Sequence, residues 1–373
     1  MRDTLAALAT LALLLALSMT ATAARPTADE IRNDMGIAST AEVRGQRDAV
    51  GYAATREAMA KVWSAAAEGP EPEGFGAPLP APGVAAVIGP HDDYVYAARV
   101  YRRLYPLVTA KTVIVVGVFH RYRRFEARDQ LVFDSYRAWR APDGDIAISP
   151  LRDELVAAMP AGMAVRDNEA HDSEHSIEGI AYFLKHARPD VEIVPVIVPA
   201  ASFERLGALS ASLGDALAGA MKRRGWTLGR DVAIVISTDG THYGEDFKYT
   251  PYGAGGVEAF MKAMAHDRAL VRDALAKPPS AAAARLFYST VVDPARPDQY
   301  RVPWCGRFSV TVGTLLMERV SQALGTPLDA VPVALGVSVD TPELPVRDVG
   351  VAPTAPANLY HFVTLPAVAY TTR

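Results

Sequence analysis

The fold is decided by the stretch Thr112-Val113-Ile114-Val115-Val116-Gly117-Val118, which is followed directly by Phe119-His120. After Thr112 this run has no polar side chain, whereas a strand with one face in water alternates apolar and polar residues. The run therefore predicts a strand that is covered on both faces. Similar apolar runs occur at residues 84–88, 191–198, 232–237 and 331–339.

Helical patterns separate these runs, at residues 96–105, 151–159, 177–187, 203–223, 257–276 and 309–324. Strands that alternate with helices pair mainly in parallel, because each helix carries the chain back along the sheet. We therefore predict an α/β fold with a mixed, largely parallel sheet sandwiched between helices. The sequence shows no internal repeat and no second core. We therefore expect a single domain of this kind, which spans residues 83–373.

The composition is that of an ordinary globular protein, with 373 residues of which 50% are hydrophobic and 21% charged. A nucleic-acid-binding protein usually has a basic excess on one face, but here the net charge is −4 and Lys and Arg are scattered. We therefore expect no nucleic-acid partner. The short basic run Arg121, Arg123 and Arg124 is interpreted as a solvated loop.

The N-terminus resembles an export signal. Residues 5–17 are apolar, and Ala21-Thr22-Ala23 fits the small-x-small rule for cleavage, so we predict a signal peptide over residues 1–23. As a helix the apolar run would span only about 20 Å, less than the roughly 30 Å hydrocarbon core of a bilayer. An exported protein, periplasmic or secreted, with no stable membrane span after cleavage is the expectation, and an uncleaved anchor is the alternative.

Residues 24–82 are predicted to form an N-terminal extension. It has a helical pattern at 48–66 and then a Pro/Gly-rich linker at 69–82, which carries five prolines. The α/β domain is expected to begin near Gly83.

Three histidines directly follow three of the apolar runs. His91 follows the run 84–88, His120 follows 112–118, and Asp239 with His242 follows 232–237. Ligands of open α/β sheets bind outside the carboxyl ends of the strands, so parallel neighbours would bring these side chains together. Each histidine alone is more often an ordinary polar loop residue, but their joint placement predicts a site.

A fourth cluster is His171-Asp172-Ser173-Glu174-His175-Ser176. Ser176 is expected to cap the following helix, which would place His171 and His175 in the preceding loop. Two interpretations stay open: a purely structural cap, or a site in which the carboxylates and imidazoles of this cluster act as orienting or acid–base groups.

Cys305 is the single cysteine of the chain, so no intramolecular disulfide can form. It lies just before the helical pattern at 309–324, and the aligned amides of a helix start lower the pKa of a thiol. The thiolate would then serve as a nucleophile or a metal ligand. The alternative is a buried, inert thiol.

The order of these motifs resembles the Memo-like family, also called AmmeMemoRadiSam system protein B. The matching motifs, spread over residues 83–339, are Pro90-His91-x-x-Tyr94-x-Tyr96, Gly117-x-x-His120, Asp172-x-Glu174-His175-Ser176-Ile177-Glu178, Ser237-x-Asp239-x-x-His242-x-Gly244 and Cys305-Gly306-Arg307. The resemblance implies a fold like that of class III extradiol dioxygenases and a mononuclear metal held by His91, His120 and Cys305. Copper and iron are both associated with the family. The chain departs from the family pattern at Asp92, Asp93 and Phe119, so substrates do not carry over.

Two imidazoles and a thiolate suit Cu or Fe, with Zn also compatible, and exclude Mg and Ca. The leading hypothesis is a redox metalloenzyme acting on O2 or a small-molecule substrate, in which His242 with Asp239 moves protons and His175 with Asp172 assists. The first alternative is a non-catalytic metal- or ligand-binding protein with a dioxygenase-like cleft, since a thiolate is prone to oxidation. The second is metal-free hydrolysis with Cys305 as nucleophile, activated by His91 or His242.

Overall fold

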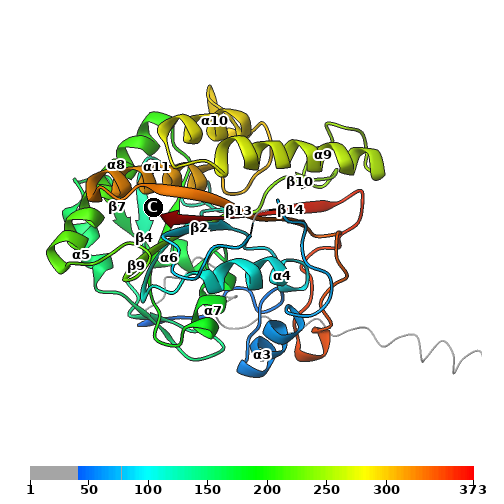
Figure 1. Cartoon of the computed structure of the whole chain (residues 1–373), viewed down its shortest axis with the longest axis horizontal. Helices are drawn as coiled ribbons and strands as arrows, with labels where there is room; N and C mark the ends of the chain where they lie inside the picture. Colours follow the sequence, from blue (N-terminus) through cyan, green and yellow to red (C-terminus); the bar gives the residue numbers. More distant parts are fainter. Residues whose placement is uncertain (1–40, 77) are drawn as a thin grey trace, which may run out of the picture. The chain divides into compact units, whose positions relative to one another are not determined.

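The computed structural model describes residues 41–76 and 78–373, which belong to one compact unit, residues 38–373. A 12-stranded mixed sheet forms its centre (Figure 1). Its main path, in spatial order, is β1 (Val43–Arg44), β5 (Ala138–Trp139), β6 (Ile146–Ile148), β8 (Glu192–Val198), β3 (Thr112–Val118), β9 (Val232–Ser237), β2 (Ala86–Gly89), β14 (Phe362–Thr372) and β10 (His242–Tyr243). The strands β8, β3, β9 and β2 pair in parallel, as predicted.

Helices cover both faces of this sheet (Figure 1). One side carries α3 (Arg56–Ala65), α4 (Tyr94–Leu104) and α7 (Glu178–Ala187), and the other carries α8 (Phe203–Arg224), α9 (Val257–Leu270), α10 (Ala281–Val291) and α11 (Arg307–Leu324). Two shorter helices, α5 (Leu151–Ala158) and α6 (Asn168–Asp172), follow β6 and β7 along the chain. The prediction of a largely parallel sheet between helices is therefore confirmed.

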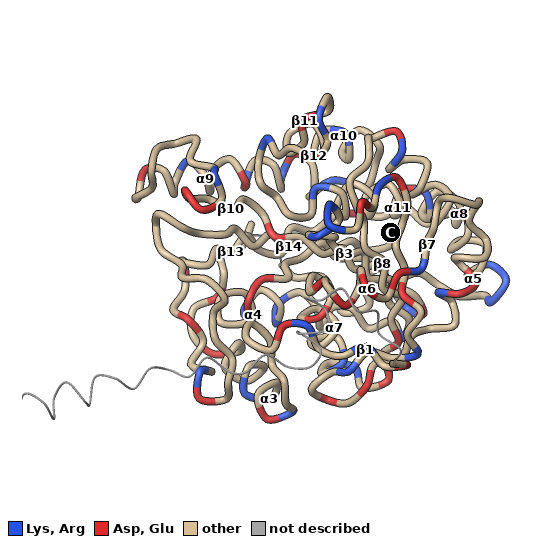
Figure 2. Tube along the Cα trace, turned by 180° about the vertical axis from the view of Figure 1, so that it is seen from behind, with Lys and Arg blue, Asp and Glu red and all other residues tan. Residues whose placement is uncertain are grey.

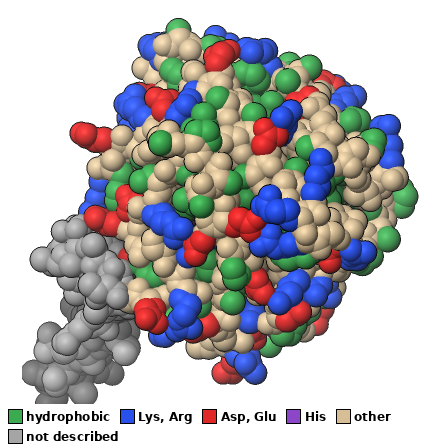
Figure 3. Space-filling model, turned by 90° about the vertical axis from the view of Figure 1, so that its left-hand side faces the viewer, with side chains coloured by type: hydrophobic (Ala, Val, Ile, Leu, Met, Phe, Trp, Pro, Cys, Tyr) green, Lys and Arg blue, Asp and Glu red, His purple; other side chains and the backbone are tan. Residues whose placement is uncertain are grey.

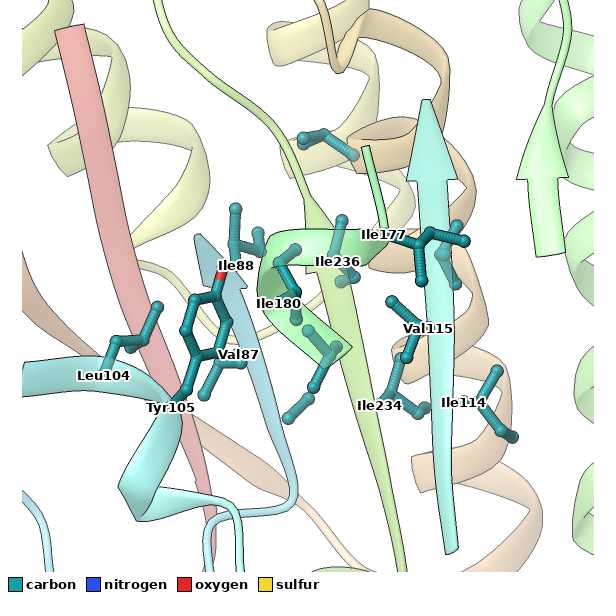
Figure 4. Close-up of a cluster of buried hydrophobic side chains, with 14 of the residues drawn as sticks. Val87, Ile88, Leu104, Tyr105, Ile114, Val115, Ile177, Ile180, Ile234 and Ile236 are labelled. Atoms are coloured by element: carbon teal, nitrogen blue, oxygen red, sulfur yellow. The ribbon is translucent and has the colours of Figure 1, made fainter. Parts of the chain in front are cut away.

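Apolar side chains of the parallel strands form the core (Figure 4). Val87 of β2, Val115 of β3 and Ile236 of β9 are fully buried, and Ile180 of α7 and Leu104 of α4 pack in the same cluster. Charged residues lie mainly on helices and loops, whereas β3 and β14 carry none (Figure 2). Lys and Arg are interspersed with Asp and Glu on the face shown in Figure 3.

The close approach of α11 to β9 gives a stability prediction. A Cβ at Gly313 of α11 would overlap the side chain of Ile236, so Gly313→Ala should destabilise the protein by about 1–3 kcal/mol. Gly207 of α8 has no atom of another residue within 4 Å of its Cβ position, so Gly207→Ala should stabilise by about 0.5–1 kcal/mol through helix propensity. Urea unfolding of both variants measures the difference. Equal effects would contradict the packing of α11 against β9.

The N-terminal part of the described chain is integrated in this unit. Strand β1 pairs in parallel with β5, and Tyr52, Met59 and Val62 are buried in the core. The residues before Gly83 thus contribute to the α/β unit, although we expected an extension. Its helix, α3, begins at Arg56 rather than near 48, because the Asp48 carboxylate accepts hydrogen bonds from the amides of Val50 and Gly51 in a turn.

The predicted signal peptide, residues 1–23, lies outside the described residues, as does the first part of the extension. Among the helices of residues 41–76 and 78–373, none combines the length and the apolar character needed to cross a bilayer.

Several elements were not predicted. The longest strand, β14, pairs antiparallel with both β13 (Leu328–Val337) and β2. Two short strands, β4 (Leu131–Phe133) and β7 (Ala164–Arg166), extend the sheet, and β11 (Val292–Asp293) and β12 (Arg296–Tyr300) form a separate hairpin. The helix expected at 257–276 is divided into α9 and a π-helical turn, Val271–Leu275. Short 3-10 helices lie at Tyr105–Leu107 and Arg347–Val349.

Candidate metal centre

Three neighbouring parallel strands deliver the site residues. His91 lies two residues beyond the end of β2, His120 two beyond β3, and Asp239 two beyond β9. Because β3, β9 and β2 are adjacent and parallel, these residues meet at one edge of the sheet. The predicted gathering is therefore observed.

Two groups of side chains at this edge could hold a metal ion, and each offers ligand atoms that lie within 4.8 Å of one another. The first consists of His91, His120 and His175, and the second of His91, Asp239 and Cys305. In the first group the rings of His120 and His175 are stacked with centroids 5.0 Å apart, and the His91 ring is 5.2 Å from that of His120.

In the second group the His91 Nε2 atom is 3.6 Å from the Cys305 Sγ atom and 3.3 Å from an Asp239 carboxylate oxygen. The three ligands implied by the resemblance are thus divided: His91 belongs to both groups, His120 to one and Cys305 to the other.

Hydrogen bonds fix which ring nitrogen of His91 faces the site. The Ser237 hydroxyl is 2.7 Å from His91 Nδ1 and donates its own proton to the Ser176 carbonyl at 2.6 Å. The hydroxyl must therefore accept from Nδ1–H, which leaves the Nε2 lone pair of His91 free.

His120 is oriented by a carboxylate. Its Nδ1 atom lies 2.9 Å from Glu174 Oε1, and because an ionised carboxylate only accepts, Nδ1 carries the proton. Glu174 is held in place by the backbone N–H groups of His120, His175 and Ser176. This arrangement, in which a carboxylate holds one nitrogen of a histidine, is typical of metal-binding histidines.

Burial sets the charge states of the histidines. It lowers the pKa of His91 well below its usual value, and the charges of His120 and His175 act in the same direction. Burial also lowers the pKa of His175. Although burial opposes protonation of His120 as well, Glu174 raises the pKa of that ring. His91 is therefore a neutral imidazole at neutral pH, which is the form that binds a metal.

Cys305 lies beside Asp239, whose backbone N–H points to the Sγ atom at 3.0 Å. Burial and then the Asp239 carboxylate raise the pKa of the Cys305 thiol well above its ordinary value. The prediction of a lowered pKa was therefore wrong for the metal-free protein. The amides at the start of α11 are outweighed because a thiolate would lose its hydration next to a carboxylate.

A cavity of about 360 Å³ is lined by His91, His120, His175 and Asp239, whereas Cys305 is not part of its lining. His242 lines it, and the Nδ1 atom of His242 lies 3.0 Å and 3.1 Å from the carbonyl oxygens of Gly240 and Pro303, which can only accept. Nδ1 therefore carries the proton, and burial lowers the pKa of His242 to about 4, so the ring is neutral. Burial also raises the pKa of Asp239, which lines the cavity too, to about 7.

Other predicted residues lie away from the cavity. The Tyr136 hydroxyl lies 2.7 and 2.8 Å from the two oxygens of the Asp172 carboxylate, which share its one proton, and Asp172 is not part of the cavity lining. His171 belongs to α6, not to a loop. Ser176 does not cap α7, which begins after Ile177, because its hydroxyl donates to the Val118 carbonyl at the end of β3.

The sequence reasoning did not assign roles to several residues of the site. Ser237 orients His91, and the Tyr52 hydroxyl donates a short hydrogen bond to the His91 carbonyl. Glu174, one of the carboxylates for which an orienting role was left open, orients His120. Arg44 and Glu178 form a buried ion pair next to the loop that carries Glu174. Ser237 could have been found from the sequence, because it is a polar residue at the end of an apolar strand. Nothing in the sequence links Arg44 to Glu178, which lie 134 positions apart.

The comparisons with known proteins point to one family. Residues 51–326 match the sequence profile described as Memo-like protein. The chain is similar to a MEMO1 family protein of Thermococcus onnurineus (strain NA1), with 30% identity over 179 residues, which cover 46% of this chain and 57% of the relative. A MEMO1 family protein of Pyrococcus abyssi (strain GE5 / Orsay) is 30% identical over 178 residues, covering 45% and 56%, and one of Aquifex aeolicus (strain VF5) is 27% identical over 164 residues, covering 43% and 40%.

The first two of these alignments span a little over half the length of the relatives. The profile match extends over most of the chain and includes His91, His120, His175, Asp239 and Cys305. Both the matched region and the arrangement of these residues lead to one assignment: the chain belongs to the Memo-like protein family.

Proposed function

We propose that this is an exported protein that holds one transition metal with His91, His120 and Cys305 and uses it as a Cu- or Fe-dependent redox enzyme. The observation that carries the proposal is the Nε2 atom of His91, which is unprotonated and faces the Cys305 thiol at 3.6 Å. Export rests on the sequence pattern of residues 1–23 alone.

The His91–Cys305 pair of this donor set fits a transition metal, whereas His120 belongs to the other group. Bonds of about 2.3 Å to sulfur and about 2.0–2.1 Å to an imidazole, at a tetrahedral angle, would separate the two ligand atoms by about 3.5 Å. The 3.6 Å between Cys305 Sγ and His91 Nε2 agrees with this value. A thiolate with imidazoles suits Cu, Fe or Zn and does not suit Mg or Ca. His175 and Asp239 flank the set as members of the two groups.

Bound copper or iron would supply one-electron chemistry and an open position for O2 or a small substrate. The protein's own residues would manage protons and position. Nε2 of His242 can accept a proton, because Nδ1 is engaged with two carbonyl groups. Asp239, with a pKa of about 7, can hold or release a proton near neutral pH. The 360 Å³ cavity is large enough for a small organic substrate.

Elemental analysis of the protein purified from its native compartment tests the metal centre. Wild type should carry close to one Cu or Fe per chain, whereas His91→Ala and Cys305→Ser should lose most of it. His186→Ala is the matched control, because His186 pairs with Asp143 and is not part of the cavity lining. The same sub-stoichiometric metal content in all four proteins would contradict the proposal.

Oxygen uptake tests turnover. The protein is loaded with metal under anaerobic conditions and then given oxygen with catechols or small reductants. Uptake no faster than with free metal would contradict the proposal that the protein is a redox enzyme.

A non-catalytic metal-binding protein is the second candidate. A thiolate beside oxygen chemistry is converted to sulfenic and sulfinic acids, so a thiolate ligand suits a metal that does not react with O2. Cys305, which would supply this thiolate, is 7% exposed. Full metal loading without oxygen uptake would support this function.

Alkylation separates both candidates from a metal-free cysteine hydrolase. Because burial raises the pKa of Cys305, iodoacetamide should react more slowly with the native metal-free protein than with the protein unfolded in urea. Metal should slow the reaction further. Rapid alkylation of the native protein, unchanged by metal, would instead support Cys305 as a nucleophile. Mass spectrometry of the intact chain follows the reaction, since Cys305 is the single cysteine.

A further inference from the structure

A second feature near the site is the buried guanidinium of Arg307, the first residue of α11. Arg307 is 2% exposed, and within the described residues its Nε and Nη1 atoms have no hydrogen-bond partner. Its Nη2 atom donates to the Tyr122 hydroxyl at 3.2 Å. Arg307 also forms no ion pair with any carboxylate of residues 41–76 and 78–373. A buried cation without a counter-charge is costly, so this side chain calls for an anion.

The surroundings leave the edge of the guanidinium available. The rings of Tyr300 and Phe308 lie 3.6 Å and 4.7 Å from its central carbon, and they cover its faces. Arg307 and these two rings line a small cavity of about 20 Å³. His120 and Cys305 line the same cavity, which therefore adjoins the candidate metal centre.

The charges around this small cavity are basic. The carboxylate that comes near is Asp298, which Tyr122 reaches by a hydrogen bond of 3.5 Å, and Asp298 is already paired with Arg128 at 3.4 Å. The Arg123 guanidinium donates to the Asp298 backbone carbonyl. One carboxylate therefore faces several guanidinium groups.

The large cavity has the opposite character. It is lined by four carboxylates, those of Asp48, Asp92, Asp93 and Asp239, and no Lys or Arg is among its described lining residues. His120 lines both cavities. The small cavity thus offers an anion a guanidinium, which the described lining of the large cavity does not.

We propose that the small cavity is a binding site for a monovalent anion of halide size, held by an N–H group of Arg307. The Nε–H and Nη1–H groups point to different sides of the guanidinium, both lack a partner among the described residues, and either one can bind an anion by a charge-assisted hydrogen bond. The size follows from the cavity, because about 10–15 Å³ of such volume already holds one water molecule and 20 Å³ leaves no room for phosphate or sulfate. The site would balance the charge beside His120 whether or not a metal is bound.

Halide binding to the full-length protein tests the site. Titration with chloride at constant ionic strength, with gluconate as the replacement anion, is followed by chlorine NMR line broadening. Wild type should show saturable broadening, and Arg307→Gln should weaken the affinity on the order of tenfold or more, since it removes the charged donors. The matched control is Arg128→Gln, an exposed arginine of the same neighbourhood, which should keep wild-type affinity. Equal affinity in all three proteins, or no saturable broadening in wild type, would overturn the proposal.

Two further measurements keep the result independent of folding and of the metal. Bromide-soaked crystals of wild type should give an anomalous peak within hydrogen-bond distance of Arg307, and a peak elsewhere or none would overturn the site even if Arg307→Gln fails to fold. The titration is repeated on His91→Ala: halide affinity should persist there although metal is lost. Loss of halide binding together with the metal would mean that the halide binds the metal, which contradicts the site at Arg307.

Discussion

Arg44→Met is expected to lower the free energy of unfolding by about 3–5 kcal/mol, because it removes one partner of a buried ion pair. Arg44 and Glu178 are 1% and 0% exposed and lie 2.5 Å apart. Arg44 also donates to the backbone carbonyls of His171, at 2.7 Å, and of Glu174, at 2.6 Å. The substitution would leave a carboxylate and two carbonyls without their donor, at the loop that carries Glu174 and His175. Urea unfolding followed by circular dichroism measures the loss.

An exposed arginine provides the control. Arg319 lies 2.7 Å from Asp215 with both side chains about half exposed, so Arg319→Met should leave the stability almost unchanged. The double variant Arg44→Met/Glu178→Leu should recover part of the loss, since it removes both buried charges. If Arg44→Met were no less stable than Arg319→Met, the buried pair would not support the loop as described.

Glu174→Gln is expected to weaken metal binding about 10–100-fold, the range typical of removing a group that orients a metal-binding histidine. Glu174 is 3% exposed and accepts from His120 Nδ1 at 2.9 Å. A neutral amide would no longer make the His120 ring a stronger metal ligand. It could also turn its own N–H group toward His120 Nδ1. Competition with a chelator, followed for the metal that the purified protein contains, measures the affinity. Glu258→Gln is the control, because Glu258 is an exposed residue of α9 that does not line the cavity.

The same variant has a defined pH dependence. Although burial opposes ionisation of Glu174, the His120 charge and its hydrogen bond hold the pKa of Glu174 well below its usual value. A carboxylate whose pKa falls on folding stabilises the fold above its unfolded pKa of about 4.3, and this stability is lost as the pH falls. The stability difference between wild type and Glu174→Gln should therefore shrink progressively below about pH 4. A constant difference between pH 7 and pH 2 would mean that folding does not lower the pKa of Glu174.

The strands that carry the site could be predicted because their burial is visible in the chain. Residues 113–118 and 232–236 are apolar throughout and lie in β3 and β9. Strand β14 was missed because its partner β2 lies far away in the sequence, and because Pro366 in its middle disfavours a central strand by local rules. Its position depends on pairing that no local pattern records.

The sequence by itself determined the buried parallel strands and placed His91, His120 and Asp239 just after them, because the apolar runs and their ends are local features. The tertiary structure alone decided which groups meet. It divided the implied ligands between two groups that share His91, and it moved Asp172 onto Tyr136. It also raised the pKa of Cys305, since burial beside Asp239 outweighs a helix start. These outcomes depend on distances and desolvation between residues far apart in the chain, which exist only once the chain has folded.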